Sequence, residues 1–257
     1  MASNGAATEG GKMYRSIMVV DKTSRCISVV DSLLKCRMLG LNAKGVAPRS
    51  RRPIRMVTLA TLGQHVYIFD VKEFEELFEE GNLKVRLESS KMLKVVHDFR
   101  NIAETLYNTF GVKVRNVFDT HAAYQTIAIQ RGILETKALS MDDLFALYTR
   151  PANPESPYIK RWTSANSKCF TLRPITKCVA YYTAFNACCL LTCVYEDQVR
   201  LIRLNYWPLL ATLSDDQLGN RTNSKDLIVE ALVQSVKDQE RDLECRFGES
   251  FPEDYEA

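Results

Sequence analysis

A cluster of arginines could bind phosphate groups. The segment APRSRRPIR carries Arg49, Arg51, Arg52 and Arg55 in a proline-containing stretch between two predicted strands. A guanidinium group binds a phosphate through two parallel hydrogen bonds, and each neutralised phosphate makes nucleic-acid affinity more salt-dependent. A solvated basic loop has the same composition. The segment is therefore a candidate phosphate-binding loop, with an unliganded surface loop as the alternative.

A second candidate combines two cations with an aromatic ring. Lys160, Arg161 and Trp162 lie in a stretch rich in proline, asparagine and serine, residues 149–168, which we predict to be a long loop. Proteins that bind single-stranded nucleic acid use positive groups along the backbone and aromatic rings on which bases stack. The triplet is therefore a candidate contact for the backbone and bases of a single-stranded nucleic acid.

Cysteine and histidine residues do not form a metal-binding pattern. The eight cysteines lie mostly in apolar segments without a C-x-x-C pair, and the histidines are His65, His97 and His121. Structural zinc sites need four such ligands at close spacing. We therefore expect buried, reduced thiols, no metal and no cofactor.

The composition predicts one large α/β domain. The chain has 257 residues, of which 46% are hydrophobic and 25% charged, and its formal net charge is only +3. With so small a charge, nucleic-acid affinity would have to come from local clusters of Lys and Arg. The sequence shows no secretory signal and no uninterrupted apolar run near the ~18 to 20 residues of a membrane span. We expect a soluble cytoplasmic protein without a membrane partner.

Short β-branched runs alternate with segments of helical period, which favours a sheet covered by helices. We predict strands at 16–20, 38–46, 55–62, 65–71, 91–97 and 115–120. The two-residue turn Gly63-Gln64 makes the third and fourth runs an antiparallel hairpin and the sheet mixed. Predicted helices cover 24–35, 72–80, 101–110, 121–130, 176–195 and 223–245.

The predicted domain spans residues 13–247. Residues 1–12 and the acidic tail at 248–257 lack periodicity and are expected to be flexible, while 205–246 should form C-terminal helices. The apolar residues of the last helix suit either the core or a dimer surface, and the sequence does not separate the two.

Three motifs follow one another in the order of a known family. They are VTLATLGQHVYIFDV at 57–71, KMLKVVHDFRNIAETLYNTFGVKVRNVFDTHAA at 91–123, and LRPITKCVAYYTAFNACCLL at 172–191. Together they resemble the 3'-5' exonuclease domain of the RNase D type over residues 36–195. The resemblance implies a ribonuclease H-like fold, with a mixed central sheet flanked by helices.

An active enzyme of this type is implied to hold two divalent ions about 4 Å apart with four acidic side chains. At the corresponding positions this sequence has Asn42, Lys44, Ile102 and Asn186, and it keeps the tyrosine of the last motif as Tyr182. Mg²⁺ and Mn²⁺ prefer anionic oxygen ligands. The resemblance therefore implies a pseudonuclease without metal ligands, in which Lys44 either contacts a phosphate or is a neutral replacement.

Two acids remain inside the matched motifs, Asp98 and Asp119. In the family pattern they lie beside the metal site, so we expect them to be structural caps or hydrogen-bond acceptors.

The loss of the acids within an intact motif framework resembles the Exd-type pseudonucleases of the piRNA pathway and the exonuclease-like domain of Egalitarian. This implies an inactive, homodimeric RNA adaptor in small-RNA silencing, with a Tudor-domain partner, in cytoplasmic germline ribonucleoprotein granules. Unlike Exd-type proteins, this sequence shows no clear N-terminal Lsm-like domain. The alternatives are a protein scaffold that binds no RNA and an active RNase D-like exonuclease.

Overall fold

The computed structural model describes residues 13–45, 54–133, 137–148, 152–164, 169–219 and 224–248. The segments predicted to be flexible, 1–12 and most of the tail at 248–257, lie outside these residues, so the predicted domain boundaries stay predictions.

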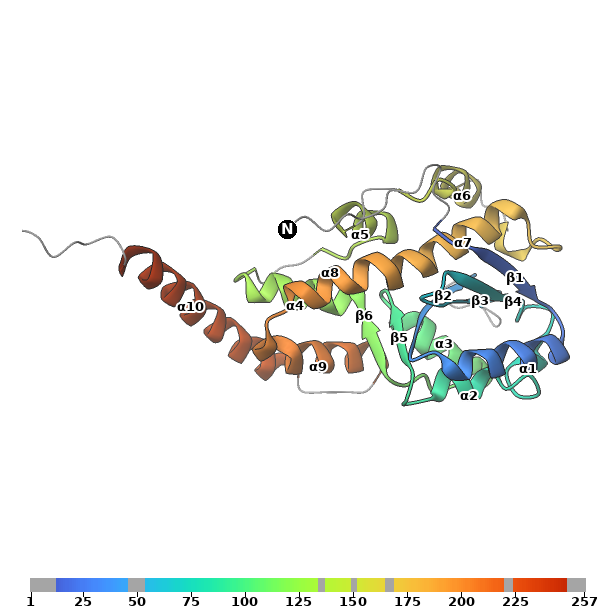
Figure 1. Cartoon of the computed structure of the whole chain (residues 1–257), viewed down its shortest axis with the longest axis horizontal. Coiled ribbons are helices and arrows are strands. Elements are labelled where there is room, and N and C mark those ends of the chain that lie inside the picture. The colour runs from blue at the N-terminus through green and yellow to red at the C-terminus, as the bar shows by residue number, and fades with distance from the viewer. Residues whose placement is uncertain are drawn as a thin grey trace, which may run out of the picture.

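Six strands form one mixed sheet, in the spatial order β1-β4-β3-β2-β5-β6 (Figure 1). All six predicted strands are present, most of them shorter than predicted: Ser16–Val20 (β1), Met38–Lys44 (β2), Met56–Ala60 (β3), His65–Phe69 (β4), Leu93–Val96 (β5) and Val117–Asp119 (β6). β3 and β4 form the predicted antiparallel hairpin, while β2 pairs antiparallel with β3 and parallel with β5. The predicted mixed sheet is confirmed.

Helices cover both faces of the sheet (Figure 1). One face packs against α1 (Thr23–Ser32), α2 (Leu83–Glu88) and α3 (Arg100–Phe110), whose buried residues share a core cluster with Leu39, Leu41 and Ala43 of β2. Because successive strand residues point to opposite faces, the other face of β2 presents Gly40, Asn42 and Lys44.

The opposite face is crossed by one long helical segment. It consists of α7 (Lys177–Cys189), a π-helical turn (Leu190–Val194) and α8 (Tyr195–Leu201). By length and apolar composition this segment could cross a membrane, whereas we predicted no apolar run of that length. However, 67% of its most apolar window is buried inside the protein. Packing against the sheet accounts for its hydropathy.

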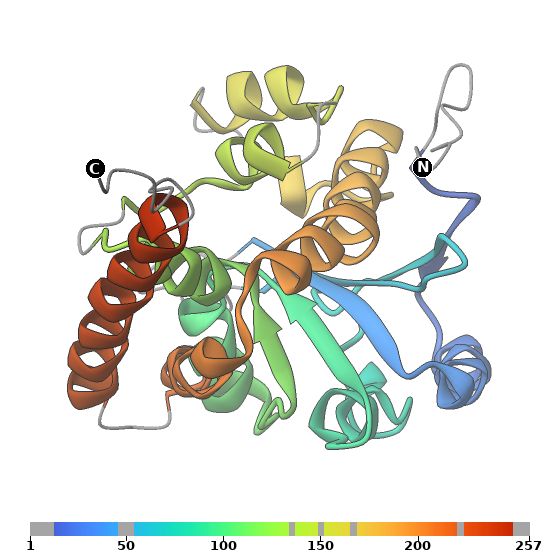
Figure 2. The ribbon, with the colours of Figure 1, turned by 60° about the vertical axis from the view of Figure 1, so that its left-hand side comes forward.

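A further group of helices lies at the β6 end of the molecule. α4 (Thr120–Gln130), α9 (Trp207–Gln217) and α10 (Ser224–Gly248) lie side by side (Figure 2). α10 packs Leu227, Ile228, Ala231 and Leu232 against the core there. From this contact α10 extends away from the sheet (Figure 1).

Two local predictions were wrong. The segment predicted as a helix at 72–80 contains only a short 3-10 turn, Glu75–Leu77. The predicted loop at 149–168 contains a helix, α6 (Ser156–Ser164), preceded by α5 (Met141–Tyr148). Pro157 in the first turn of α6 costs nothing there, because its missing N–H would have no partner within the helix.

Candidate functional site

A close approach between β2 and α7 builds one wall of the site. A methyl group at Gly40 would lie 2.1 Å from the carbonyl oxygen of Ala187, so only glycine lets the helix backbone come this near. Asn42 and Lys44 follow on the same face of β2 and therefore look toward α7. Asn42 is 5% exposed, and its side-chain nitrogen has no hydrogen-bond partner among the described residues.

α7 supplies the facing wall. The helix begins after Thr176, whose hydroxyl accepts a hydrogen bond from the Val179 N–H. Tyr182 and Asn186 are one helical turn apart and lie on the same face. The ammonium group of Lys44 lies 5.2 Å from the centre of the Tyr182 ring, a cation–π distance that ties the end of β2 to α7.

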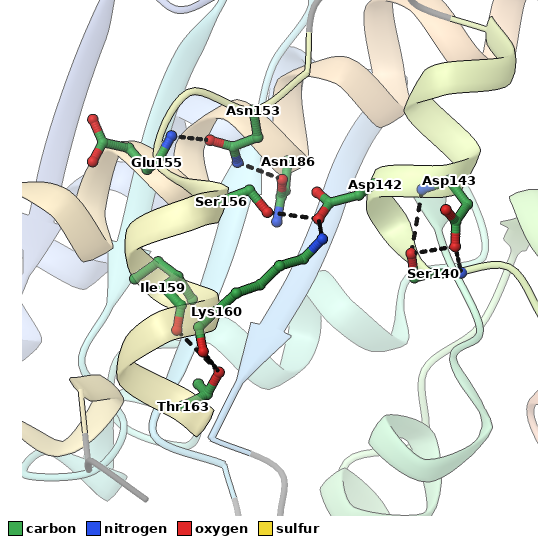
Figure 3. A network of polar contacts seen from close by, with 10 residues as sticks. All are labelled: Ser140, Asp142, Asp143, Asn153, Glu155, Ser156, Ile159, Lys160, Thr163 and Asn186. Atoms are coloured by element: carbon green, nitrogen blue, oxygen red, sulfur yellow. Dashed lines mark hydrogen bonds and ion pairs between the residues drawn. The ribbon is translucent and has the colours of Figure 1, made fainter. Parts of the chain in front are cut away.

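A buried asparagine before α6 fixes the orientation of the Asn186 amide. Asn153 Nδ2 donates to the Tyr182 carbonyl (3.0 Å), and Asn153 Oδ1 accepts from the Glu155 N–H (3.0 Å). These backbone partners allow one orientation of the Asn153 amide, and its NH₂ group therefore also donates to Asn186 Oδ1 (2.8 Å; Figure 3). Asn186 is fully buried, and its Nδ2 has no hydrogen-bond partner in the described part of the chain. The unused atom of Asn186 is therefore a donor.

One carboxylate from α5 completes the site. Asp142 forms an ion pair with Lys160 of α6 (2.5 Å) and accepts a hydrogen bond from the Ser156 hydroxyl (2.6 Å; Figure 3). Its other oxygen, Oδ1, is buried and unpaired within the described residues. The Asp142 charge also acts on Lys44 and on the Tyr182 hydroxyl.

Burial dominates the proton equilibria of the site. It lowers the pKa of Lys44 to about 8, and the Asp142 carboxylate opposes this shift only in part. Burial also raises the pKa of Tyr182, and the interaction with the neighbouring Asn186 side chain lowers it by a smaller amount. At neutral pH the site therefore presents a cationic Lys44 and a neutral phenol.

A family profile described as 3'-5' exonuclease matches residues 47–195, more than half of the chain. The chain belongs to the 3'-5' exonuclease family. The chain is 30% identical over 190 residues to a protein named "Egalitarian protein homolog" from Caenorhabditis elegans, covering 71% of this chain and 32% of that protein. It is 28% identical over 138 residues to "piRNA biogenesis protein EXD1" from Bombyx mori, covering 53% of this chain and 43% of that protein. The chain thus spans less than half the length of these relatives.

Solved structures confirm the fold. RNase D from Trypanosoma brucei in complex with GMP superposes with a TM-score of 0.66 at 18% identity, over 80% of this chain and 65% of that chain. Escherichia coli RNase D gives 0.62 at 15% identity, over 79% of this chain and 51% of that chain. The predicted RNase D-like, ribonuclease H-like architecture of this exonuclease-family chain is therefore confirmed.

The residues present do not fit the two metal ions that an active member of the exonuclease family is implied to hold. Around Tyr182 the site offers the ammonium group of Lys44 and the unpaired amide nitrogens of Asn42 and Asn186. The single carboxylate beside them, Asp142, is engaged by Lys160 and Ser156. A divalent cation needs acceptor oxygens. Among the described residues, no group of three or more His, Cys, Asp or Glu side chains could hold a metal ion. Asn186 Oδ1, an oxygen that could have served, already accepts from Asn153.

Other motif residues of the exonuclease family have separate surroundings. Ile102 lies in the first turn of α3 and packs against the core cluster under α1–α3. Asp119 caps α4 by accepting from the His121 N–H (2.8 Å), and it also accepts from the N–H groups of Asp98 (3.1 Å) and Phe99 (2.9 Å). The structural role predicted for Asp119 is confirmed.

The predicted arginine loop begins beside the site. Arg49, Arg51 and Arg52 lie outside the described residues. The Arg55 N–H donates to the Lys44 carbonyl (2.8 Å), so the two ends of the loop meet at the end of β2. The loop is thus attached directly next to Lys44.

The structure changes the interpretation of the second RNA-binding candidate. Lys160, Arg161 and Trp162 lie on α6 and not in an irregular loop. Residues two apart on a helix point in nearly opposite directions, so Lys160 and Trp162 cannot form one continuous patch. Of the three, Lys160 reaches Asp142.

Sequence reasoning missed Asp142 and Asn153. Ser140 and Asp143 form a capping pair at the start of α5, with the Ser140 hydroxyl donating to Asp143 Oδ2 (2.7 Å). That pattern could have predicted the helix. It could not predict that Asp142 turns inward, because this depends on the packing of α5 against α6 and α7.

Proposed function

We propose that this exonuclease-family chain is a catalytically inactive, RNA-binding adaptor in piRNA or related small-RNA silencing. The observation that carries the proposal is the set of donors around Tyr182, where Lys44 and the free amide nitrogens of Asn42 and Asn186 offer positive charge and N–H groups. Such a set matches a phosphate oxygen. Exonuclease chemistry by two metal ions needs the opposite set, one of acceptors.

Electrostatic repulsion supports the inactivity. At about 4 Å and an effective dielectric constant near 20, two unit charges interact by about 4 kcal/mol, so Lys44 would oppose a divalent ion by about 8 kcal/mol. The lowered pKa of Lys44, about 8, still leaves the side chain mostly protonated at neutral pH.

The case for RNA rests on Lys44 and on the arginines that the sequence places in the segment after it. Lys44 stands at the end of β2, and the ends of the segment that carries Arg49, Arg51 and Arg52 meet there. Phosphate contacts by Lys and Arg supply most of the affinity of non-specific nucleic-acid binding. The relative named "piRNA biogenesis protein EXD1" supports the choice of pathway.

The adaptor role includes a homodimer. On α10 the apolar residues Val229, Val233 and Val236 are 59%, 51% and 55% exposed and lie at helical spacing, as in a helix that packs against a second copy. A Tudor-domain partner and a place in cytoplasmic germline granules belong to the same proposal. They rest on the resemblance to Exd-type proteins.

A salt titration of RNA binding tests the central claim. Binding of a labelled single-stranded RNA should weaken as salt rises, with a slope of about 0.7 in log K against log salt for each phosphate contacted. The double variant Arg51→Ala, Arg52→Ala should reduce this slope by about 1.4. The matched control is Lys22→Ala, Lys35→Ala, which removes two exposed cations flanking α1 on the other face of the sheet.

Three results would contradict the proposal in different ways. If neither salt nor the arginine substitutions affect binding, the phosphate contacts are absent. If no RNA binds at all, a protein scaffold is the better description. If repurified protein degrades RNA in Mn²⁺, the chain is an active exonuclease.

A further inference from the structure

Three donors of the site have no anionic partner in direct contact within the described residues. Lys44 lies over the Tyr182 ring, and the side-chain nitrogens of Asn42 and Asn186 are buried without a hydrogen-bond partner among the described residues. Leaving a buried donor unpaired costs about 1 to 3 kcal/mol. Such groups are expected where a ligand completes the site.

The nearest anion belongs to the protein itself. Asp142 is held by Ser156 and Lys160, and its charge reaches Lys44 and Tyr182. Figure 3 shows its carboxylate directed from α5 toward Ser156 and Lys160. One of its oxygens, Oδ1, is buried and has no hydrogen-bond partner within the described residues, so the carboxylate itself is only partly hydrogen-bonded.

The side chains around Asp142 could release it at modest cost. Lys160 is 67% exposed, and an exposed ion pair contributes at most about 1 kcal/mol. The Ser156 hydroxyl can donate to any other oxygen acceptor. A phosphate oxygen arriving from solvent offers both groups the same contacts that the carboxylate now provides.

We propose that the donors around Tyr182 form a metal-free anion site for one phosphate group, and that the Asp142 carboxylate occupies this site until an RNA phosphate displaces it. The incoming phosphate contacts Lys44, Lys160 and the free amide nitrogen of Asn186. No bond is made or broken. The assignment to an RNA phosphate rests on the proposed function, whereas the site itself does not.

The test compares two neighbouring carboxylates on α5. Asp142→Asn removes the internal anion and keeps an oxygen for Ser156. Asp143→Asn is the matched control, because Asp143 is exposed and pairs with Ser140 at the helix start. Both variants change the net charge by the same amount. Lys44→Met removes the central cation with little change in shape.

Two probes are measured on the full chain: anisotropy of a fluorescein-labelled single-stranded RNA, and thermal stabilisation by inorganic phosphate. Asp142→Asn should tighten RNA binding about fivefold, the effect expected when the partly exposed ion pair with Lys160 no longer competes with the phosphate. Asp143→Asn should change RNA binding less than twofold. Phosphate should raise the melting temperature of Asp142→Asn more than that of the wild type. Adding Lys44→Met should abolish both gains.

The outcomes separate the two proposals. Equal gains for Asp142→Asn and Asp143→Asn mean that only bulk charge matters, and the site is refuted while RNA binding stands. If wild type binds RNA and Asp142→Asn binds no better, the displacement is refuted. If neither the wild type nor any variant binds RNA, but phosphate stabilises Asp142→Asn and this gain is lost on adding Lys44→Met, the anion site stands and the RNA adaptor is refuted. If neither probe responds in Asp142→Asn, the anion site falls as well.

Discussion

Replacing Gly40 by alanine will push β2 and α7 apart. The added methyl group would lie 2.1 Å from the Ala187 carbonyl oxygen, 3.1 Å from its carbon and 3.4 Å from the Leu191 Cβ. Real Cβ atoms essentially never come within 3.0 Å of another heavy atom. The strand or the helix must therefore move by roughly 1 Å in a close-packed interior.

The expected cost follows from this displacement. Overpacking a core by a methylene group costs about 1 to 3 kcal/mol, and a clash with backbone belongs at the upper end because no side-chain rotation relieves it. Burial of the extra methyl returns about 0.8 kcal/mol. We expect Gly40→Ala to lower the free energy of unfolding by about 2 kcal/mol, which with an m value near 2 kcal/mol/M shifts the urea midpoint by about 1 M.

Urea unfolding followed by circular dichroism and by tryptophan fluorescence measures this shift. The matched control is Gly63→Ala in the β3–β4 turn, where the nearest atom to the added methyl is in the His65 ring at 3.3 Å and can move. Its midpoint should stay within the experimental error of the wild type. If Gly40→Ala is as stable as Gly63→Ala, α7 does not approach β2 as described, and the contact between Lys44 and Tyr182 loses its basis.

Three further predictions concern charge, metal and assembly. Lys94 is fully buried, donates to the Arg115 carbonyl (2.8 Å), and has a pKa lowered by burial to about 8. Because the unfolded state holds this proton more tightly, stability should rise from pH 8 toward pH 10.5, and Lys94→Met should flatten that rise in melting temperatures measured across this range. The triple variant Asn42→Asp, Lys44→Glu, Asn186→Asp should be less stable than the wild type without metal and should gain about 2.7 kcal/mol in Mn²⁺ at one hundred times the dissociation constant, while the wild type gains nothing in the same thermal-shift assay. Val233→Asp should halve the solution mass measured by light scattering, and an unchanged dimer would place the contact elsewhere.

Strands could be predicted from the sequence because β-branched runs are a local signal. The β3–β4 hairpin could be predicted from its turn residues, but the predicted two-residue turn Gly63-Gln64 was wrong. The Gln64 N–H donates to the Thr61 carbonyl (2.9 Å), so Leu62 and Gly63 are the central residues of the turn, and Gln64 follows them with a positive φ of 61°. The helix predicted at 72–80 was wrong, because a single 3-10 turn is enough there to bury Leu77 and Phe78 in the core. α6 was missed because proline, asparagine and serine also mark helix starts, as Ser156 and Pro157 do here.

The residues of the site also differ in whether a local sequence pattern could identify them. Asn42, Lys44, Tyr182 and Asn186 could be identified from motifs, since each motif fixes its residues at constant spacing along one strand or one helix. Asn153 and Asp142 could not. Their partners lie far away in the sequence: Asn153 reaches Asn186, and Asp142 reaches Lys160. Local pattern contains no information on such pairs.

The change from carboxylate to amide would not by itself exclude a metal ion at Asn186, because an amide still has an oxygen. Asn153 decides the matter. The orientation of the Asn153 amide is set by the Tyr182 carbonyl and the Glu155 N–H. Asn153 must therefore present its NH₂ group to Asn186, and the Asn186 oxygen accepts this hydrogen bond. What remains is a buried N–H group on the Lys44 side of the helix. We therefore expect Asn42, Lys44 and Asn186 to disfavour a divalent cation, and in the proposed RNA-binding role the same donors would contact a phosphate oxygen.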